Sequence, residues 1–226
     1  MESLLGYLPF DLEQIPFIVI TLIIAFTLHE FAHAYTAYKF GDPTAKNQGR
    51  LTLAPHVHLD PIGTILIFIA GFGWAKPVPV NRFYFKNPRL AGILVSLAGP
   101  LSNLLLACIG YFLFFFMVRF GVLDGLSVPV LEKVEMFFGI FTHLNVLLFI
   151  FNLLPFPPLD GYRIIEDLVP TSFRVKMTRL EPYGILLFLV LIFTPLGDYT
   201  IRPLLYDFIP FVSGTLAQWI SALLLS

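Results

Sequence analysis

The sequence predicts an all-α polytopic membrane protein, and its composition and its long uncharged runs lead to this fold class. Hydrophobic residues make up 57% of the 226 residues, and charged residues make up 13%. Soluble domains contain about 25% charged residues. Apolar runs near the length of about 20 residues that a transmembrane helix needs recur along the chain. We therefore expect a single transmembrane domain over residues 1–226, with about five spanning helices.

The expected helices lie between the charges that flank each uncharged run. The five candidate spans are residues 15–38, 90–118, 136–159, 182–197 and 208–226. The run 182–197 is short for a span, so flanking residues would have to lengthen it. The first segment follows an acidic N-terminus without the basic region of a cleaved signal peptide, and we expect it to be retained.

Residues 61–75 form a different kind of uncharged segment. This run has 15 residues, which is too few to cross a bilayer as a helix, and it is rich in glycine. Non-helical backbone is tolerated at membrane depth only where protein or water covers it. We expect a re-entrant hairpin or a short β-like segment near residues 62–80.

The basic residues predict the orientation of the chain. Eleven of the 14 Lys and Arg residues fall in segments 39–89 and 155–181, with seven in the first and four in the second. Basic residues of short loops stay on the cytoplasmic side. Both segments are thus expected in the cytoplasm and the N-terminus outside.

Composition also excludes some partners. The formal net charge is −1, whereas proteins that bind nucleic acids need a basic surface, so we expect the lipid bilayer and not nucleic acid as a partner. The single cysteine, Cys108, cannot form an internal disulfide and is interpreted as a small buried apolar residue.

Three ionisable residues lie within the first expected span. His29, Glu30 and His33 form an HExxH pattern, although one such residue at the bilayer centre costs about 2.5–3.5 kcal/mol. Histidines four residues apart share a helix face and can bind one metal ion, while the glutamate between them can reach a water. On a soluble helix the same pattern could be a solvated surface. Inside a span it indicates a metal site, and zinc suits imidazole ligands.

A third ligand is expected from another part of the membrane domain. Asp160 is the acidic residue flanked by apolar chain near the cytoplasmic end of a later span. Pro155, Pro157 and Pro158 precede it and would break the helix. Taken alone, Asp160 and Gly161 could equally form an ordinary turn where the helix leaves the membrane.

Together, the two motifs resemble the site-2 protease family of intramembrane zinc metalloproteases. That family combines HExxH in one transmembrane helix with an Asn-to-LDG motif in a later one, here residues 29–33 and 152–161. Residues 97–103 resemble a further family signature, and segments 55–64 and 74–79 resemble the compact bacterial or archaeal branch. We expect neither the PDZ insertions nor the appended regulatory domain that other members of the family carry. Tyr162 departs from the second glycine that many members have there.

The resemblance implies a function and a set of site residues. His29, His33 and Asp160 would hold one Zn²⁺ per chain, and Glu30 would be the general base that takes a proton from water. Asn152 would hydrogen-bond the substrate. The substrates would be transmembrane proteins cut within or next to their spanning segments. The resemblance also implies a multi-pass protein of a prokaryotic inner membrane. With the orientation that the basic residues predict, its active site would lie toward the cytoplasm.

Other polar residues have more than one interpretation. Asn145 and Asn152 are seven residues apart on one helix face and could bond across helices. His56 and His58 could cap a cytoplasmic loop or form a second metal pair. His143 is interpreted as an interhelical hydrogen-bond donor.

Two other classes of function compete with proteolysis. A divalent-metal transporter would also bury His and Asp residues on broken helices. A non-catalytic membrane scaffold would keep the fold without turnover. Glu30 favours the enzyme, because it lies where a catalytic base belongs and the site does not need it as a ligand.

Overall fold

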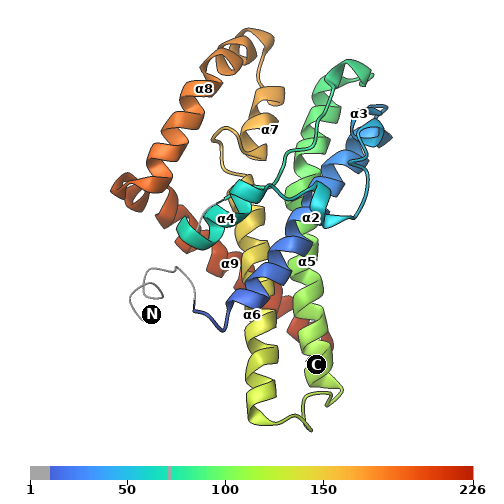
Figure 1. Ribbon diagram of the computed structural model, residues 1–226, viewed down its shortest axis with the longest axis vertical. Helices are drawn as coiled ribbons and strands as arrows, with labels where there is room; N and C mark the ends of the chain where they lie inside the picture. Colours follow the sequence, from blue (N-terminus) through green and yellow to red (C-terminus); the bar gives the residue numbers. More distant parts are fainter. Residues whose placement is uncertain (1–10, 71–72, 226) are drawn as a thin grey trace.

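The computed structural model describes residues 11–70 and 73–225, and its regular elements there are helices (Figure 1). Within these residues the only extended pairing is a single antiparallel bridge between Leu59 and Ala75. The predicted all-α class is therefore confirmed for the described chain.

Four of the described helices are long and apolar enough to cross a membrane. They are α2 (Ile15–Lys39), α5 (Pro88–Arg119), α6 (Val128–Asn152) and α9 (Ile201–Leu225). The other expected span falls in α8 (Thr171–Phe193), whose first half carries Arg174, Lys176, Arg179 and Glu181. The protein is thus a polytopic membrane protein.

Two of these helices begin earlier than the charge pattern predicts. Helix α6 starts at Val128 and includes Glu132, Lys133 and Glu135, whereas the prediction began it after Glu135. Helix α9 starts at Ile201 and includes Arg202 and Asp207. Charged side chains near a helix end can extend toward the polar interface, so a helix need not stop where its apolar run stops.

Helix α5 is the centre of the bundle. It packs against α2, α6, α9 and the short helix α7 (Asp160–Leu168) (Figure 1). Asn87 caps its first turn by accepting from the Leu90 N–H, and Pro88 follows at a position where a missing N–H costs nothing. Its buried face includes Ala91, Gly92 and Gly99, small residues that let helices approach closely in a membrane.

The glycine-rich segment forms a helix and an extended return. Helix α4 (Pro61–Ala70) has ten residues, about 15 Å, and its Ile67 packs against Ile18, Leu22 and Phe26 of α2. Residues 71–72, within the segment where a hairpin or β-like structure was expected, lie outside the described residues. The chain then returns as residues 74–81, which we call the strap, and the Lys76 N–H donates to the His58 carbonyl at 2.8 Å.

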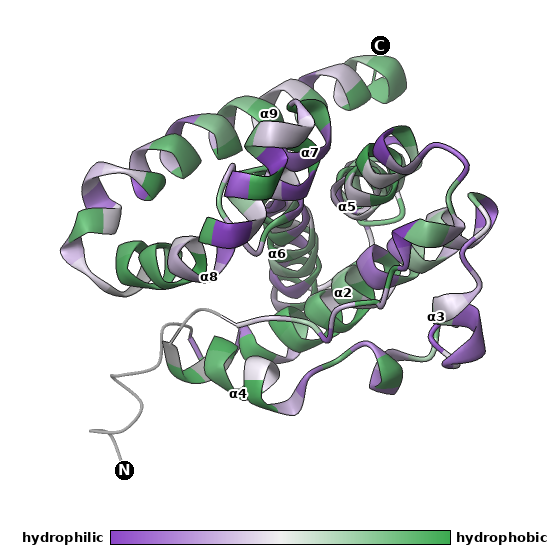
Figure 2. Ribbon diagram, turned by 90° about the horizontal axis from the view of Figure 1, so that it is seen from above, coloured by the Kyte–Doolittle hydropathy of each residue, from purple (hydrophilic) through white to green (hydrophobic). Residues whose placement is uncertain are grey.

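Parts of the two basic segments lie together at one end of the molecule (Figure 1). Helix α3 (Thr44–Asn47), the start of α5, α7 and the start of α8 lie together at the upper end in Figure 1. Figure 2 looks down on this end and shows hydrophilic residues on α3, α7 and α8. The remaining short elements are 3-10 helices at Pro55–Val57, Arg82–Tyr84 and Pro195–Tyr199.

Candidate metal centre

Two helices bring three possible metal ligands together. Helix α2 buries His29 and His33 one turn apart, and α7 carries Asp160 at its first position. The two Nε2 atoms are 3.0 Å apart, and each lies 3.3 Å from Oδ2 of Asp160. The three predicted ligands thus lie within reach of one ion, although Asp160 is 127 or more residues from the two histidines in sequence.

The hydrogen bonds behind the two imidazoles determine which nitrogen carries the proton. Nδ1 of His33 lies 2.7 Å from the Val95 carbonyl, which can only accept, so this nitrogen is the donor. Nδ1 of His29 likewise donates to Oδ1 of Asn103 at 2.7 Å. Both Nε2 atoms are then unprotonated in neutral rings and face Oδ2 of Asp160, which is buried without a hydrogen-bond donor. Three such acceptors in contact could share one metal ion.

The geometry of these acceptors suits zinc. Zinc takes His and Asp ligands at about 2.0–2.2 Å in tetrahedral sites, which places neighbouring ligand atoms about 3.3–3.6 Å apart. The observed separations of 3.0, 3.3 and 3.3 Å approach the edges of one tetrahedral face. Two His ligands and one carboxylate would leave the fourth position open, as in catalytic zinc sites.

The path of the chain after α6 places Asp160. Helix α6 ends at Asn152, and the proline-containing residues 153–159 are not helical, as the prolines predict. Gly161 then brings the first turn of α7 against the end of α6, since a Cβ there would lie 2.2 Å from the Leu153 carbonyl oxygen. The carboxylate of Asp160 in this first turn also suits the positive end of the helix dipole.

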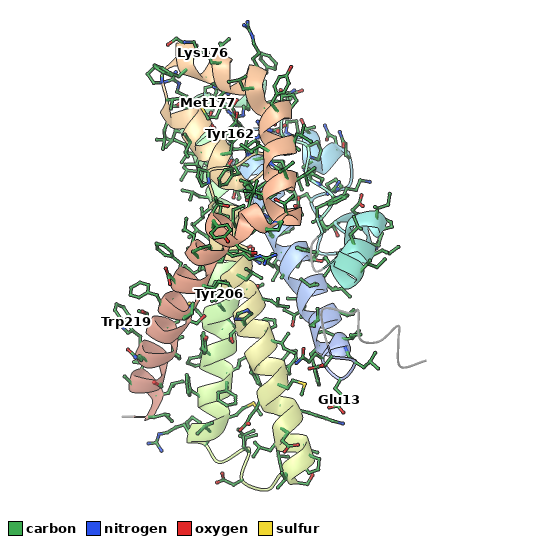
Figure 3. All side chains as sticks on the ribbon, turned by 90° about the vertical axis from the view of Figure 1, so that its left-hand side faces the viewer. Glu13, Tyr162, Lys176, Met177, Tyr206 and Trp219 are labelled. Carbon is green, nitrogen blue, oxygen red and sulfur yellow. The ribbon has the colours of Figure 1, made fainter. Side chains whose placement is uncertain are left out.

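Polar contacts fix α7 to α8. The Tyr162 hydroxyl donates to the Met177 carbonyl at 2.8 Å (Figure 3), so the residue that departs from the family pattern has a structural role. Arg163 pairs with Glu181 through both guanidinium nitrogens. Burial raises the pKa of Glu166, but the Thr178 hydroxyl and Arg163 outweigh burial and lower that pKa. These contacts hold the helix that carries Asp160.

A glycine of α5 makes room for the imidazoles. A Cβ at Gly99 would lie 2.3 Å from Nε2 of His33 and 2.6 Å from Cε1 of His29. Gly99 thus lets the α5 backbone approach both His29 and His33.

The Glu30 carboxylate contacts the strap. Glu30, which follows His29 in the sequence, is buried, and its Oε2 accepts a hydrogen bond from the Val78 N–H at 2.8 Å. The predicted base is therefore held by a backbone group that lies 48 residues away in the chain. No side-chain pattern in the sequence indicates this contact.

Two buried asparagines support His29 from behind. Asn103 of α5 donates to the Ala25 carbonyl at 3.4 Å and to Oδ1 of Asn145 in α6 at 3.2 Å, while its Oδ1 accepts from His29. The interhelical bond predicted for Asn145 is confirmed. The role of Asn103 was missed, although it closes the signature at residues 97–103, because nothing in the sequence pairs it with His29.

We expect Asn103→Ala to weaken zinc affinity about 10- to 100-fold, as loss of a partner of a ligating histidine typically does. The reason is that Nδ1 of His29 would lose the acceptor that fixes its ring. Competition with a chelator would measure the affinity. Asn103→Asp, which keeps an oxygen facing Nδ1, should bind zinc more tightly than Asn103→Ala; equal affinities for both variants and the wild type would contradict this role.

The other polar candidates lie outside the metal cluster. His58 is fully buried and its Nε2 donates to the Thr52 carbonyl at 2.7 Å, so it caps a loop. His56 and His143 are exposed, and neither belongs to the metal cluster found among the described residues. Asn152 is half-buried, and its amide donates to the Leu148 carbonyl of its own helix at 2.9 Å.

Comparisons with known proteins agree with this arrangement. The chain matches the model of peptidase family M50 over residues 17–194. It is 60% identical over 199 residues to the protein named "Putative zinc metalloprotease YwhC" of Bacillus subtilis (strain 168), covering 88% of this chain and 90% of that protein. No solved structure matches the chain.

A more distant similarity extends to mycobacteria. The protein named "Putative zinc metalloprotease Rip2" of Mycolicibacterium smegmatis is 29% identical over 205 residues, which cover 88% of this chain and 75% of that protein. Its namesake in Mycobacterium tuberculosis is 31% identical over 179 residues, which cover 76% of this chain and 65% of that protein. The match to the family model includes both motifs of the metal cluster, and the chain belongs to peptidase family M50, the site-2 protease family.

Proposed function

We propose that the protein is a zinc-dependent intramembrane endopeptidase in which His29, His33 and Asp160 bind the metal and Glu30 is the general base. The observation that carries this proposal is the triangle of three buried acceptors without a donor, with Glu30 adjacent to His29 in sequence. We further propose that the whole chain, residues 1–226, is one domain, since the described spanning helices α2, α6 and α9 all pack against α5.

The proposed roles follow from the chemistry of each group. Bound zinc would supply a Lewis acid, which polarises a carbonyl oxygen and lowers the pKa of water to about 7. Glu30 accepts the proton of the attacking water and passes it to the leaving amine. The Val78 N–H holds Oε2 of Glu30, so Oε1 is the oxygen that we assign to proton transfer.

Asn152 is proposed to hydrogen-bond the substrate. A side-chain amide has two N–H donors, and the Leu148 carbonyl takes one of them. The second donor can serve a substrate carbonyl at the end of α6, eight residues before Asp160. Loss of a donor to a developing oxyanion costs about 3–4 kcal/mol in other proteases.

The position of the site implies how substrates must bind. Glu30 lies nine residues before the end of α2, about 14 Å along the helix, so the peptide bond is cut inside the membrane near one face. A peptide bond within a stable helix is shielded. We therefore propose that the substrate is a transmembrane helix that unwinds locally and meets the site as an extended segment.

The test of this function is cleavage of single-span peptides by the purified protein in detergent. Helix-breaking residues near the cytoplasmic end of the peptide should speed cleavage, and leucines at the same positions should slow it, because unwinding exposes the bond. The matched control has the same substitutions at the other end of the peptide. Zinc uptake into proteoliposomes without any peptide product would instead favour a transporter.

We propose that the end formed by α3, α7 and the start of α8 faces the cytoplasm, with the N-terminus outside. Eleven of the 14 basic residues fall in the two segments that meet there. In a Cys108→Ala background, Lys46→Cys and Lys176→Cys should react with an impermeant thiol reagent from the cytoplasmic side. Asp124→Cys, in the loop between α5 and α6, should react from the other side. Labelling of Lys46→Cys from outside would reverse the orientation.

A further inference from the structure

The sequence of the strap makes it extended before any contact forms. Lys76 and Val78 each precede a proline, and a residue before proline is driven out of the helical region toward extended backbone. Pro77 and Pro79 have no N–H group. Val78 is therefore the only residue of 77–79 that can donate a backbone hydrogen bond.

Groups of three different segments bond to the strap at Lys76 and Val78. The Lys76 N–H donates to the His58 carbonyl at 2.8 Å, and the Lys76 carbonyl accepts from Nη2 of Arg50 at 2.6 Å. The Val78 N–H donates to Glu30. In extended backbone, groups two residues apart point the same way, about 6.6–6.8 Å apart. Arg50 and Glu30 thus take successive positions along one edge of the strap, where a neighbouring strand would otherwise lie.

Arg50 is unusual because its charge is buried without a carboxylate partner. Its exposed fraction is 7%, its Nε is buried without a hydrogen-bond partner, and no Asp or Glu oxygen of the described residues lies within 4.0 Å of it. Burial lowers the pKa of the guanidinium, and the negative charge of Glu30 opposes that shift. Burying an unpaired guanidinium is costly, and packing alone does not require a charge at this position.

We propose that Arg50 is a positioning residue for the Glu30 base and that it acts through the strap. The guanidinium holds the Lys76 carbonyl, which sets the position of the strap, and the strap then presents the Val78 N–H to Glu30. This hydrogen bond keeps the Glu30 carboxylate in one orientation next to the two histidines. This inference rests on the proposed function, since it assigns Glu30 as the base, but the contact itself does not depend on activity.

The first test measures the contact by amide hydrogen exchange. Between residues 77 and 79 only Val78 has an exchangeable amide, so a fragment that reports on this stretch follows one hydrogen bond. Arg50→Met should speed exchange at Val78 in the zinc-free and in the zinc-bound protein, and Arg50→Lys, which keeps a donor and a charge, should restore part of the protection. Unchanged exchange in Arg50→Met would overturn the proposal.

The second test measures turnover. Arg50→Met should lower kcat by about 10- to 100-fold, as loss of one charged hydrogen bond does, with KM and zinc content unchanged. Val78→Pro removes the N–H and should lower kcat to a similar extent, and the double variant should be no worse than either single one, because both changes break the same link. Additive losses would overturn the proposal.

The matched control is Val80→Pro, which adds a proline to the same strap at an N–H that has no acceptor among the described residues. Its kcat should stay near that of the wild type. If Arg50→Met does not fold, the test uses Arg50→Lys alone. The proposal then requires that the Val78 amide exchanges faster in Arg50→Lys than in the wild type. If the wild type cleaves no peptide, the proposed function fails, while the exchange measurement still decides whether Arg50 holds the strap.

Discussion

Glu30→Gln is expected to lower the rate of peptide cleavage by about 10²–10⁴-fold or more, the contribution of general acid–base catalysis. Glutamine has nearly the same shape and can still accept from the Val78 N–H through its amide oxygen, but it cannot take a proton from water. The histidines and Asp160 are untouched, so zinc content should stay at the wild-type level. Single-turnover cleavage of a transmembrane peptide and metal analysis of the same sample would measure both quantities.

The control for this change is Glu13→Gln, an equivalent substitution at an exposed residue just before α2 (Figure 3), which should cleave like the wild type. Because substrate binding should survive in Glu30→Gln, this variant should also copurify with an uncut transmembrane substrate. Undiminished cleavage by Glu30→Gln would remove Glu30 from the mechanism.

Replacing either kind of metal ligand is expected to abolish zinc binding and with it cleavage. His33→Ala leaves one imidazole and one carboxylate, and Asp160→Ala leaves two imidazole nitrogens 3.0 Å apart without the carboxylate oxygen that faces both of them. Zinc content should fall from one ion per chain to well below one, and a strong chelator should inactivate the wild type in the same way. Added zinc should restore the chelated wild type but neither variant.

Asp124→Ala is the matched control, because this exposed aspartate lies in the loop between α5 and α6, outside the metal cluster. It should bind one zinc ion. Full zinc occupancy in Asp160→Ala would exclude Asp160 as a ligand. Zinc binding would then not explain why Oδ2 of Asp160 is buried without a hydrogen-bond partner.

The parts of the site that lie close in sequence could be predicted. The four-residue spacing of His29 and His33 alone places them on one helix face. The free-energy cost of inserting ionisable side chains into a membrane indicated that they form a functional site. Asp160 was predicted from a resemblance, since its 3.3 Å approach to both histidines depends on how α6 ends and how α7 packs on α5. The prolines predicted the break, but they did not determine the direction in which the chain continues.

The supporting contacts could not be predicted, because each joins segments far apart in the chain. Asn103 meets His29 across 74 residues, and Val78 meets Glu30 across 48. A backbone N–H has no sequence signature, and an asparagine within an apolar helix is equally compatible with packing or with a ligand's partner. Helix ends were misplaced for a related reason: charges at 132–135, 202 and 207 lie within helices that extend past their apolar runs.

The position of Asp160 on α7, far in sequence from the two histidines of α2, has a consequence for folding. Its helix α7 is attached to α8 by Tyr162 and Arg163, whereas the two histidines belong to a membrane-spanning helix at the other end of the sequence. A metal ion bound by all three side chains would therefore act as a cross-link that closes a loop of 127 residues, the difference between positions 160 and 33. Such a link favours the folded state by mass action and limits the freedom of the unfolded chain. The supply of zinc would then affect the stability of the protein as well as its activity, because without the metal fewer contacts connect α2 to α7.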